Sequence, residues 1–306
     1  MGAGHHHTPS QSAGGQQRGR MLIVLALTTI VLLAELIGSW LSGSLALLAD
    51  AGHMFTDVVG ISLAILAVTF AARPATEART FGYYRLEILA AVVNATILLG
   101  VAGFILFEAW QRWLHPAEVR GGLMLAFAGV GLVSNLIGLF LLHDGSKVSL
   151  NAKGAYLEVL GDTLGSAAVI AAAAMIAITG WQRADIVASV LVALMILPRT
   201  WTLLREAIDI LLQAVPKGTD LAAIRQHILD TPGVRDAHDL HVWTLTSGMP
   251  VLSVHVVVDD TTLDNDAGRT VLLNLRDCLA HHFDVEHCTF QLEPIGHAAQ
   301  EGSTHR

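Results

Sequence analysis

Charged residues are scarce in this chain of 306 residues: Asp, Glu, Lys and Arg make up 14% of it, against 53% for hydrophobic residues. This shortage excludes an ordinary soluble enzyme and indicates an integral membrane protein. Positive charge is not in excess either, and a formal net charge of -8 argues against a nucleic-acid partner. The two cysteines, Cys278 and Cys288, give no disulfide framework, which fits a reducing cytoplasm.

Apolar residues gather in stretches of about 20 residues, the length that a membrane-spanning helix needs. Pro198 and Arg199 interrupt the last stretch, where we expect a kink near its cytoplasmic end. We predict an all-α bundle of six transmembrane helices over residues 21–206. The six stretches are Met21–Leu41, Leu45–Ala71, Ile88–Trp110, Leu123–Leu142, Ala155–Ile178 and Ile186–Leu204.

Basic residues are divided unevenly between the two ends of these stretches. If the N-terminus lies inside, nine basic residues lie on the inner side and three on the outer side, which predicts that both termini are cytoplasmic. With no organelle signal in the sequence, a bacterial inner (plasma) membrane is the default expectation. The inner residues are Arg18, Arg20, Arg73, Arg79, Arg85, Lys147, Lys153, Arg199 and Arg205, and the outer ones are Arg112, Arg120 and Arg183.

Residues 207–295 have the mixed charge and short periodicities of a small soluble domain. Thr219 is a candidate N-cap for the first helix of this domain. The order αββαβ predicts a small α+β sandwich with helices on one face of the sheet. The expected elements are a helix from Thr219 to about Pro232, strands Asp239–Leu245 and Val251–Val258, a helix containing Val271–Leu279, and a strand His287–Leu292.

The two ends of the chain lack periodicity, and we expect disorder over residues 1–20 and 296–306. The N-terminal tail contains His5, His6 and His7. These histidines are either an incidental tract or a mobile arm that collects metal ions. The sequence leaves both interpretations open.

Ionisable residues are costly inside a membrane and therefore mark function. The stretch LLADAGHMFTD contains Asp50, His53 and Asp57 within the second apolar segment. His53 and Asp57 are four residues apart, so they share one face of a helix, and Glu158 and Asp162 repeat that spacing in the fifth segment. We predict that the two pairs meet in the bilayer and bind a divalent metal in transit.

Three more polar residues fall in the apolar segments: Glu35 in the first, Asn94 in the third and Asn135 in the fourth. Such groups serve either helix packing and a hydrated vestibule or contact with the ion. Both roles stay open for all three residues at the level of sequence.

Several motifs, in order along the chain, resemble the cation diffusion facilitator family. They are SLALLADAGHMFTD, TFGYYRLEILAAVVNA, GDTLGS, HDLHVW, SVHV and TFQLE, and the likeness runs from about Leu22 to Pro294. The resemblance implies a homodimeric, proton-coupled exporter of zinc or related divalent ions. It also implies a ferredoxin-like cytoplasmic domain and no prosthetic group.

Carried over by resemblance, the intramembrane metal site falls on His53, Asp57, Glu158 and Asp162. Zinc-transporting relatives usually have histidine where this chain has Glu158. A tetrahedral site remains possible, because zinc accepts nitrogen and carboxylate oxygen alike. The additional carboxylate makes the site harder, which relaxes its selectivity toward manganese, iron or cobalt. Cadmium is a further alternative substrate.

The resemblance also implies a metal site in the cytoplasmic domain, on His238, His255 and Glu293. His241 and Gln291 lie near them in sequence and are weaker candidates. Histidines on strands also serve as packing or surface residues, so the structural alternative stays open for this site.

The predicted function is a metal/proton antiporter that works by alternating access. Its ligands must lose protons to bind metal, so protons and metal compete for one site. A membrane metalloenzyme is a rival, but the HExxH signature is absent from the sequence and we expect no catalytic residue. A non-transporting metal sensor is the other alternative.

Overall fold

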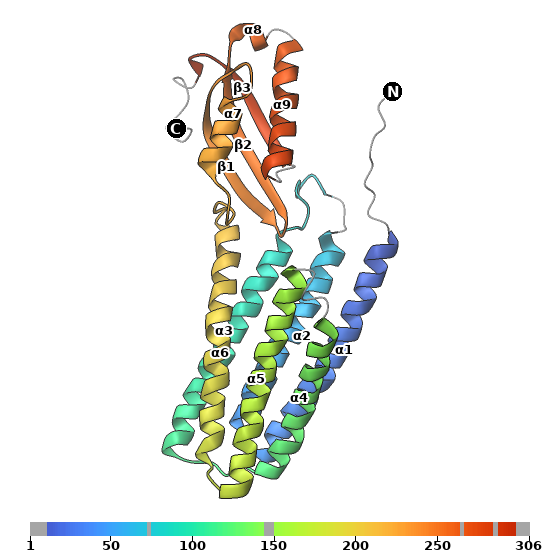
Figure 1. Cartoon of the computed structure of the whole chain (residues 1–306), viewed down its shortest axis with the longest axis vertical. Coiled ribbons are helices and arrows are strands. Elements are labelled where there is room, and N and C mark those ends of the chain that lie inside the picture. Colours follow the sequence, from blue (N-terminus) through green and yellow to red (C-terminus); the bar gives the residue numbers. More distant parts are fainter. Residues whose placement is uncertain (1–10, 72–74, 144–149, 264–265, 284–286, 298–306) are drawn as a thin grey trace. The chain divides into compact units, whose positions relative to one another are not determined.

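A computed structural model describes residues 11–71, 75–143, 150–263, 266–283 and 287–297 (Figure 1). The chain forms two compact units. The helical unit consists of Met1–Pro74 and Leu89–Arg205, and the C-terminal unit consists of Ala75–Ile88 and Glu206–Arg306. The His5–His7 tract lies outside the described residues.

Among the residues that the structure describes, six helices are long and apolar enough to cross a membrane, which agrees with the predicted number. α1 begins at Gln11, so residues 11–20 are helical, whereas the sequence suggested disorder there. Extending a helix that already exists costs little, which accounts for this longer start. α6 continues through Pro198 and ends beyond the predicted Leu204. The helices are α1 Gln11–Ser42, α2 Leu45–Ala71, α3 Leu86–Leu114, α4 Gly121–Leu142, α5 Leu150–Thr179 and α6 Arg183–Leu211.

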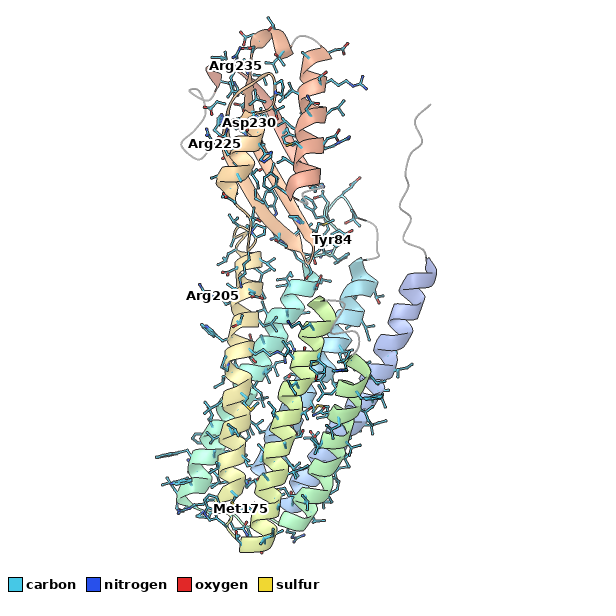
Figure 2. All side chains as sticks on the ribbon, viewed as in Figure 1. Tyr84, Met175, Arg205, Arg225, Asp230 and Arg235 are labelled. Carbon is cyan, nitrogen blue, oxygen red and sulfur yellow. The ribbon has the colours of Figure 1, made fainter. Side chains whose placement is uncertain are left out.

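The helical unit is held together by small residues at helix contacts. α1 packs on α2 and α4, and α4 packs on α5. A Cβ atom on Gly38 would lie 2.4 Å from Cγ of Phe127, so glycine is what lets α1 approach α4. Large apolar side chains stand outward; the side chain of Trp40 is 84% exposed. Met175 is another, at 42% exposed (Figure 2). An outward apolar surface of this kind fits lipid.

The N-terminus of α2 is fixed by a buried carboxylate from α6. Asp185 is 1% exposed and accepts hydrogen bonds from Ser44 Oγ at 2.5 Å, Leu45 N at 2.8 Å and Ala46 N at 3.1 Å. These bonds satisfy backbone donors that a helix start leaves without partners, and the negative charge suits the helix dipole. Asp185 therefore anchors the helix that carries His53 and Asp57.

The C-terminal unit contains a three-stranded sheet in the order β1-β2-β3. β1 and β2 are antiparallel, β2 and β3 are parallel, and α7 and α9 pack against the sheet and each other (Figure 1). The predicted α+β architecture is confirmed, with a short additional helix, α8. The elements are α7 Leu221–Leu229, β1 Val234–Thr246, β2 Met249–Val258, α8 Asp260–Leu263, α9 Asp266–Phe283 and β3 His287–Pro294.

The N-cap of α7 is Asp220, whereas the sequence suggested Thr219. Asp220 Oδ1 accepts from Ala222 N at 2.9 Å and from Ala223 N at 3.1 Å. A carboxylate also interacts favourably with the positive end of the helix dipole, which a hydroxyl does not.

The segment that links α2 to α3 belongs to the C-terminal unit, which the sequence did not indicate. Glu87 accepts hydrogen bonds from Thr246 Oγ1 and, at 2.7 Å, from Ser247 Oγ at the β1–β2 turn. The rings of Phe81 and His287 meet edge to face, with their centroids 5.5 Å apart. These contacts tie residues 75–88 to the sheet.

Candidate metal centres

The helical unit brings together one imidazole and two carboxylates from α2 and α5. His53 Nε2 lies 3.0 Å from Asp162 Oδ1 and 3.8 Å from Asp57 Oδ2. Ligand atoms of all three residues lie within 4.8 Å of one another. The side chains are 9% exposed for His53, 19% for Asp162 and 31% for Asp57, so the group is largely shielded yet reachable.

The spacing of these atoms suits a small divalent cation. With metal–ligand distances of about 2.0–2.1 Å, the ligand atoms of a tetrahedral site lie about 3.3 Å apart. The distances of 3.0 and 3.8 Å from His53 Nε2 lie on either side of that value. The mixed nitrogen and oxygen set accepts zinc and, less selectively, other divalent ions.

Glu158 lies apart from this group. Its Oε1 forms an ion pair with Nη2 of Arg199 on α6. Glu158 does not belong to the cluster whose ligand atoms lie within 4.8 Å. Its role as the fourth ligand stays a prediction, and its pairing with Arg199 was not visible in the sequence.

Polar side chains of three helices form a second network beside this group. Asn135 of α4 donates to Ser166 Oγ of α5 at 3.2 Å, and Ser166 donates to Asp50 Oδ2 of α2 at 3.3 Å. Glu35 of α1 is 1% exposed, and a Cβ atom on Gly131 would lie 2.4 Å from its Oε1. The network links the helices that carry the candidate ligands, which favours a packing role for Asn135.

Asn94 meets α2 at a glycine. Its Nδ2 lies 3.1 Å from where a Cβ atom on Gly60 would stand. The Asn94 side chain therefore packs against α2 at Gly60, and this contact favours the packing role for Asn94.

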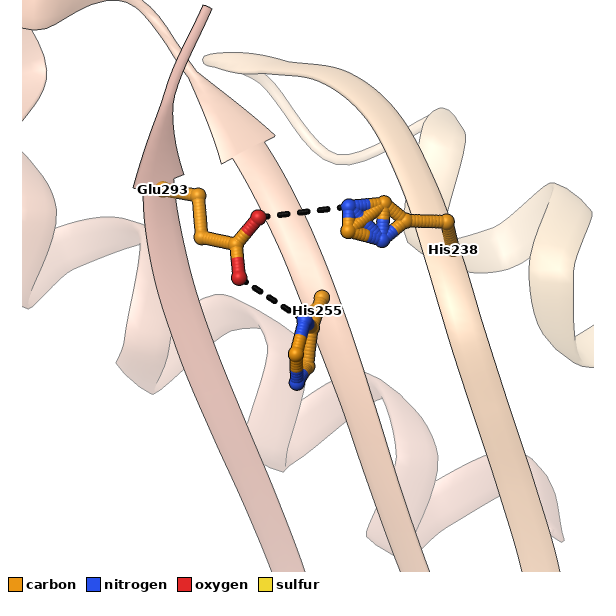
Figure 3. Close-up of side chains that lie close together, drawn as sticks. All are labelled: His238, His255 and Glu293. Atoms are coloured by element: carbon orange, nitrogen blue, oxygen red, sulfur yellow. Dashed lines mark ion pairs between the residues drawn. The ribbon is translucent and has the colours of Figure 1, made fainter. Parts of the chain in front are cut away.

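The C-terminal unit brings His238, His255 and Glu293 together from its three strands (Figure 3). His238 pairs directly with His255 across β1 and β2, and His255 pairs with Gln291, two residues before Glu293. Because side chains alternate with a period of two along a strand, all three point to one face of the sheet. The register thus assembles the cluster.

The Glu293 carboxylate lies between the two imidazoles. Its Oε2 is 3.2 Å from His238 Nε2 and its Oε1 is 2.8 Å from His255 Nδ1 (Figure 3). The Glu293 side chain is 2% exposed, and Gln291 Nε2 donates to its Oε1 at 2.8 Å. Three ligand atoms at these separations, with exposure of 18% for the His238 side chain and 15% for that of His255, can hold one divalent ion.

Asp239 was missed by the sequence reasoning. Its backbone is left-handed, with φ of 50°, at a register shift between His238 and His241. This bulge turns the carboxylate so that Oδ2 lies 3.6 Å from His255 Nε2 and Oδ1 lies 2.8 Å from His241 Nε2. His241 thus lies beside Asp239, and its side chain is 59% exposed. The one signal in the sequence was its place between two histidines in HDLHVW.

The cysteines lie outside both groups of candidate ligands. Burial raises the pKa of Cys288 to about 11 and also raises the pKa of Cys278. Both side chains therefore stay protonated near neutral pH, whereas metals bind the thiolate. The two candidate groups among the described residues consist of imidazole and carboxylate.

Six helices that can span a membrane and carry a His/Asp group, together with a small α+β unit that carries a His/Glu group, define an integral membrane protein with two groups of side chains that could hold a cation. The family model described as the cation efflux transmembrane domain matches residues 21–212. The model described as the cytoplasmic domain of cation efflux proteins matches residues 216–295. The chain belongs to this family, the cation diffusion facilitators.

Curated relatives match nearly the whole chain. "Metal cation efflux system protein CzcD" of Cupriavidus metallidurans is 48% identical over 293 residues, covering 96% of this chain and 90% of the relative. "Zinc transporter ZitB" of Escherichia coli is 41% identical over 295 residues, covering 96% and 93%. "Cadmium, cobalt and zinc/H(+)-K(+) antiporter" of Bacillus subtilis is 38% identical over 296 residues, with the same two coverages.

Proposed function

We propose that this protein exports a divalent cation, chiefly zinc, in exchange for protons. The observation that carries this proposal is the convergence of His53, Asp57 and Asp162 from two membrane-spanning helices. The names of relatives, which describe metal cation efflux, zinc transport and a cation/proton antiporter, agree with it.

The chemistry of the three ligands explains how protons and metal exchange. Zinc binds a neutral imidazole and ionised carboxylates, so each ligand that takes up a proton loses its hold on the ion. In the inward-open state the site takes metal from the cytoplasm, and in the outward-open state protons displace it. Protons then return through the same groups, which couples the two fluxes.

The orientation follows from the charge of the loops. Nine basic residues on the inner side against three on the outer side support cytoplasmic termini. The C-terminal unit then lies in the cytoplasm, as the description of its matching family model states for that family. A bacterial inner membrane and a homodimer complete the proposal.

The group of His238, His255 and Glu293 is proposed as a cytoplasmic metal site. Its support is the placement of three ligand atoms within 4.8 Å on adjacent strands. A metal site in the cytoplasmic domain would bind metal according to its cytoplasmic concentration. It would be distinct from the site in the helices that binds the transported ion. The placement of the three ligand atoms is the observation that favours a sensing role in addition to transport.

Flux in liposomes tests the proposed transport. We expect a zinc gradient to drive proton movement in vesicles that contain the wild-type protein. Asp57→Ala and Asp162→Ala should each abolish both fluxes while the protein still folds and inserts, because each removes an ion ligand and little packing. Glu118→Ala, which removes an exposed carboxylate of the helical unit, is the matched control and should transport normally.

The same experiment separates the rival functions. Near-normal flux in either aspartate variant would contradict the assigned site. Zinc binding without flux in the wild type would favour a sensor, and metal-dependent hydrolysis without flux would favour a metalloenzyme.

A further inference from the structure

Arg199 lies next to the proposed transport site. It forms an ion pair with Glu158, the predicted ligand that lies apart from His53, Asp57 and Asp162. Arg199 Nη2 contacts Glu158 Oε1, between α6 and α5. Glu158 precedes Asp162 by four residues on α5, so both carboxylates are on one helix face. An arginine is therefore bound where the resemblance places a metal ligand.

The charge of Arg199 acts on more than Glu158. Asp57 and Asp162 are close enough to interact electrostatically with its guanidinium group. Arginine keeps its positive charge at every physiological pH, and its planar group matches a carboxylate well. Within a membrane-spanning helix such a charge needs an anionic partner, and Glu158 supplies it.

We propose that Arg199 is a tethered cation that competes with the transported metal for Glu158. This inference rests on the proposed transport at His53, Asp57 and Asp162. In the metal-free site the guanidinium holds Glu158 apart from these three residues. A metal ion that enters must displace the guanidinium before Glu158 becomes its fourth ligand.

Competition of this kind sets which ions are bound. An ion gains Glu158 as a ligand only if the free energy of the new metal–carboxylate bond exceeds that of the Arg199–Glu158 ion pair that is lost. A divalent ion that binds carboxylate and imidazole strongly meets this condition, whereas a weakly bound or monovalent ion does not. Glu158, which departs from the family pattern, would therefore coordinate only those ions that bind it strongly enough to displace Arg199.

A double-mutant cycle tests the proposal. The full-length protein in lipid nanodiscs carries His255→Ala in every sample, so that the cytoplasmic group is disabled and zinc titration calorimetry reports the transport site. Arg199→Gln should tighten zinc binding at least about fivefold, the lower end of measured coupling between sites. In the Glu158→Gln background the same substitution should change zinc affinity much less, because no carboxylate remains to be released and only the charge effect on Asp57 and Asp162 is left.

Arg205→Gln provides the matched control, since Arg205 is an exposed arginine further along α6 (Figure 2). It should bind zinc as the parent does. Equal effects of Arg199→Gln in the two Glu158 backgrounds, or weaker binding with Glu158 present, would overturn the proposal. If Arg199→Gln does not fold, Arg199→Lys carries the test, because lysine holds a carboxylate by a single point charge. Unchanged zinc affinity in Arg199→Lys would then count against the competition.

The transport proposal and this inference fail separately. Asp57→Ala that still binds zinc like the parent overturns the transport site itself. Loss of binding in Asp57→Ala, together with no coupling between Arg199 and Glu158, overturns the role of Arg199 alone.

Discussion

At the scale of single residues, Asp239 lies beside His255, a member of the proposed metal site in the C-terminal unit, and we expect it to orient the imidazole. His255 presents Nδ1 to Glu293 at 2.8 Å and Nε2 to Asp239 at 3.6 Å. When Nδ1 binds metal, Nε2 carries the proton and a carboxylate beyond it holds the ring in that tautomer. The left-handed backbone of Asp239 is what brings the carboxylate to this side.

Asp239→Asn should therefore weaken zinc binding at this group by about 10- to 100-fold. Asparagine tolerates the left-handed backbone, so the bulge remains and only the charge is lost. Calorimetry on the full-length protein with Asp162→Ala, which disables the transport site, measures the effect. Asp236→Asn, which neutralises an exposed carboxylate on the same strand, is the control. Equal zinc affinities in the Asp239→Asn and Asp236→Asn variants would refute the orienting role.

The partly buried thiol of Cys288 is expected to give the C-terminal unit a stability that depends on pH. Burial raises the pKa of Cys288 to about 11, whereas a thiol in the unfolded chain titrates near about 8.5. Between these values the unfolded state loses a proton that the folded state keeps. The raised pKa therefore makes folding less favourable as the pH rises through this window.

Cys288→Ala should flatten the loss of stability between pH of about 8.5 and about 11. Urea unfolding of the reduced protein at several pH values, followed by tryptophan fluorescence, measures the slope. Other groups titrate in this range in both proteins, so the difference between the slopes is the test. Identical slopes would show that the thiol is not shielded.

At the scale of elements, Asp185 fixes the start of α2 and therefore the position of His53 and Asp57 along the helix axis. Asp185→Ala removes three acceptor contacts and leaves Leu45 N and Ala46 N without this partner. We expect a loss of about 1–2 kcal/mol, as for other N-cap deletions, and slower zinc flux. Thermal unfolding in detergent and liposome flux measure the two effects, with Glu118→Ala as the exposed control. An unchanged melting temperature would contradict the anchoring role.

Elements were predictable because their signals are local. The six apolar stretches and the αββαβ order follow from apolar runs and from the periodicity of apolar residues along short segments. The predicted helix boundaries differ most from those in the structure. The i,i+4 spacing placed His53 with Asp57, whereas only the resemblance to the family brought His255 and Glu293 together. Side-chain contacts between different helices and strands were harder to predict from the sequence.

The partners of Glu158 and His255 show why the rest was hidden. Arg199 reaches Glu158 only because α5 and α6 pack side by side, and no spacing along the chain encodes that contact. Asp239 reaches His255 only because its backbone is left-handed, a state that non-glycine residues seldom adopt. Likewise, residues 75–88 join the C-terminal unit through Glu87, far in sequence from the turn that it binds.

At the scale of the whole molecule, we expect the proposed metal site of the C-terminal unit to link zinc binding to assembly in the proposed homodimer. A ligand that binds one arrangement better than another stabilises that arrangement by the difference in affinity. His238, His255 and Glu293 come from three strands, so a bound ion fixes the sheet that carries them. We expect the dimer to bind zinc more tightly than the monomer.

Because each protomer of a homodimer carries one such group, saturating zinc should strengthen the dimer by the square of the ratio between the zinc affinities of dimer and monomer. A fivefold ratio would strengthen the dimer about 25-fold. Analytical ultracentrifugation of the full-length protein in detergent, with and without zinc, measures the change. The triple variant His238→Ala, His255→Ala, Glu293→Ala should dimerise to the same extent with and without zinc, because the ion no longer has its ligands. His115→Ala, in an exposed loop of the helical unit, should keep the wild-type response. A zinc effect of equal size in the triple variant would place the linkage at another site, with the transport ligands as the next to be tested.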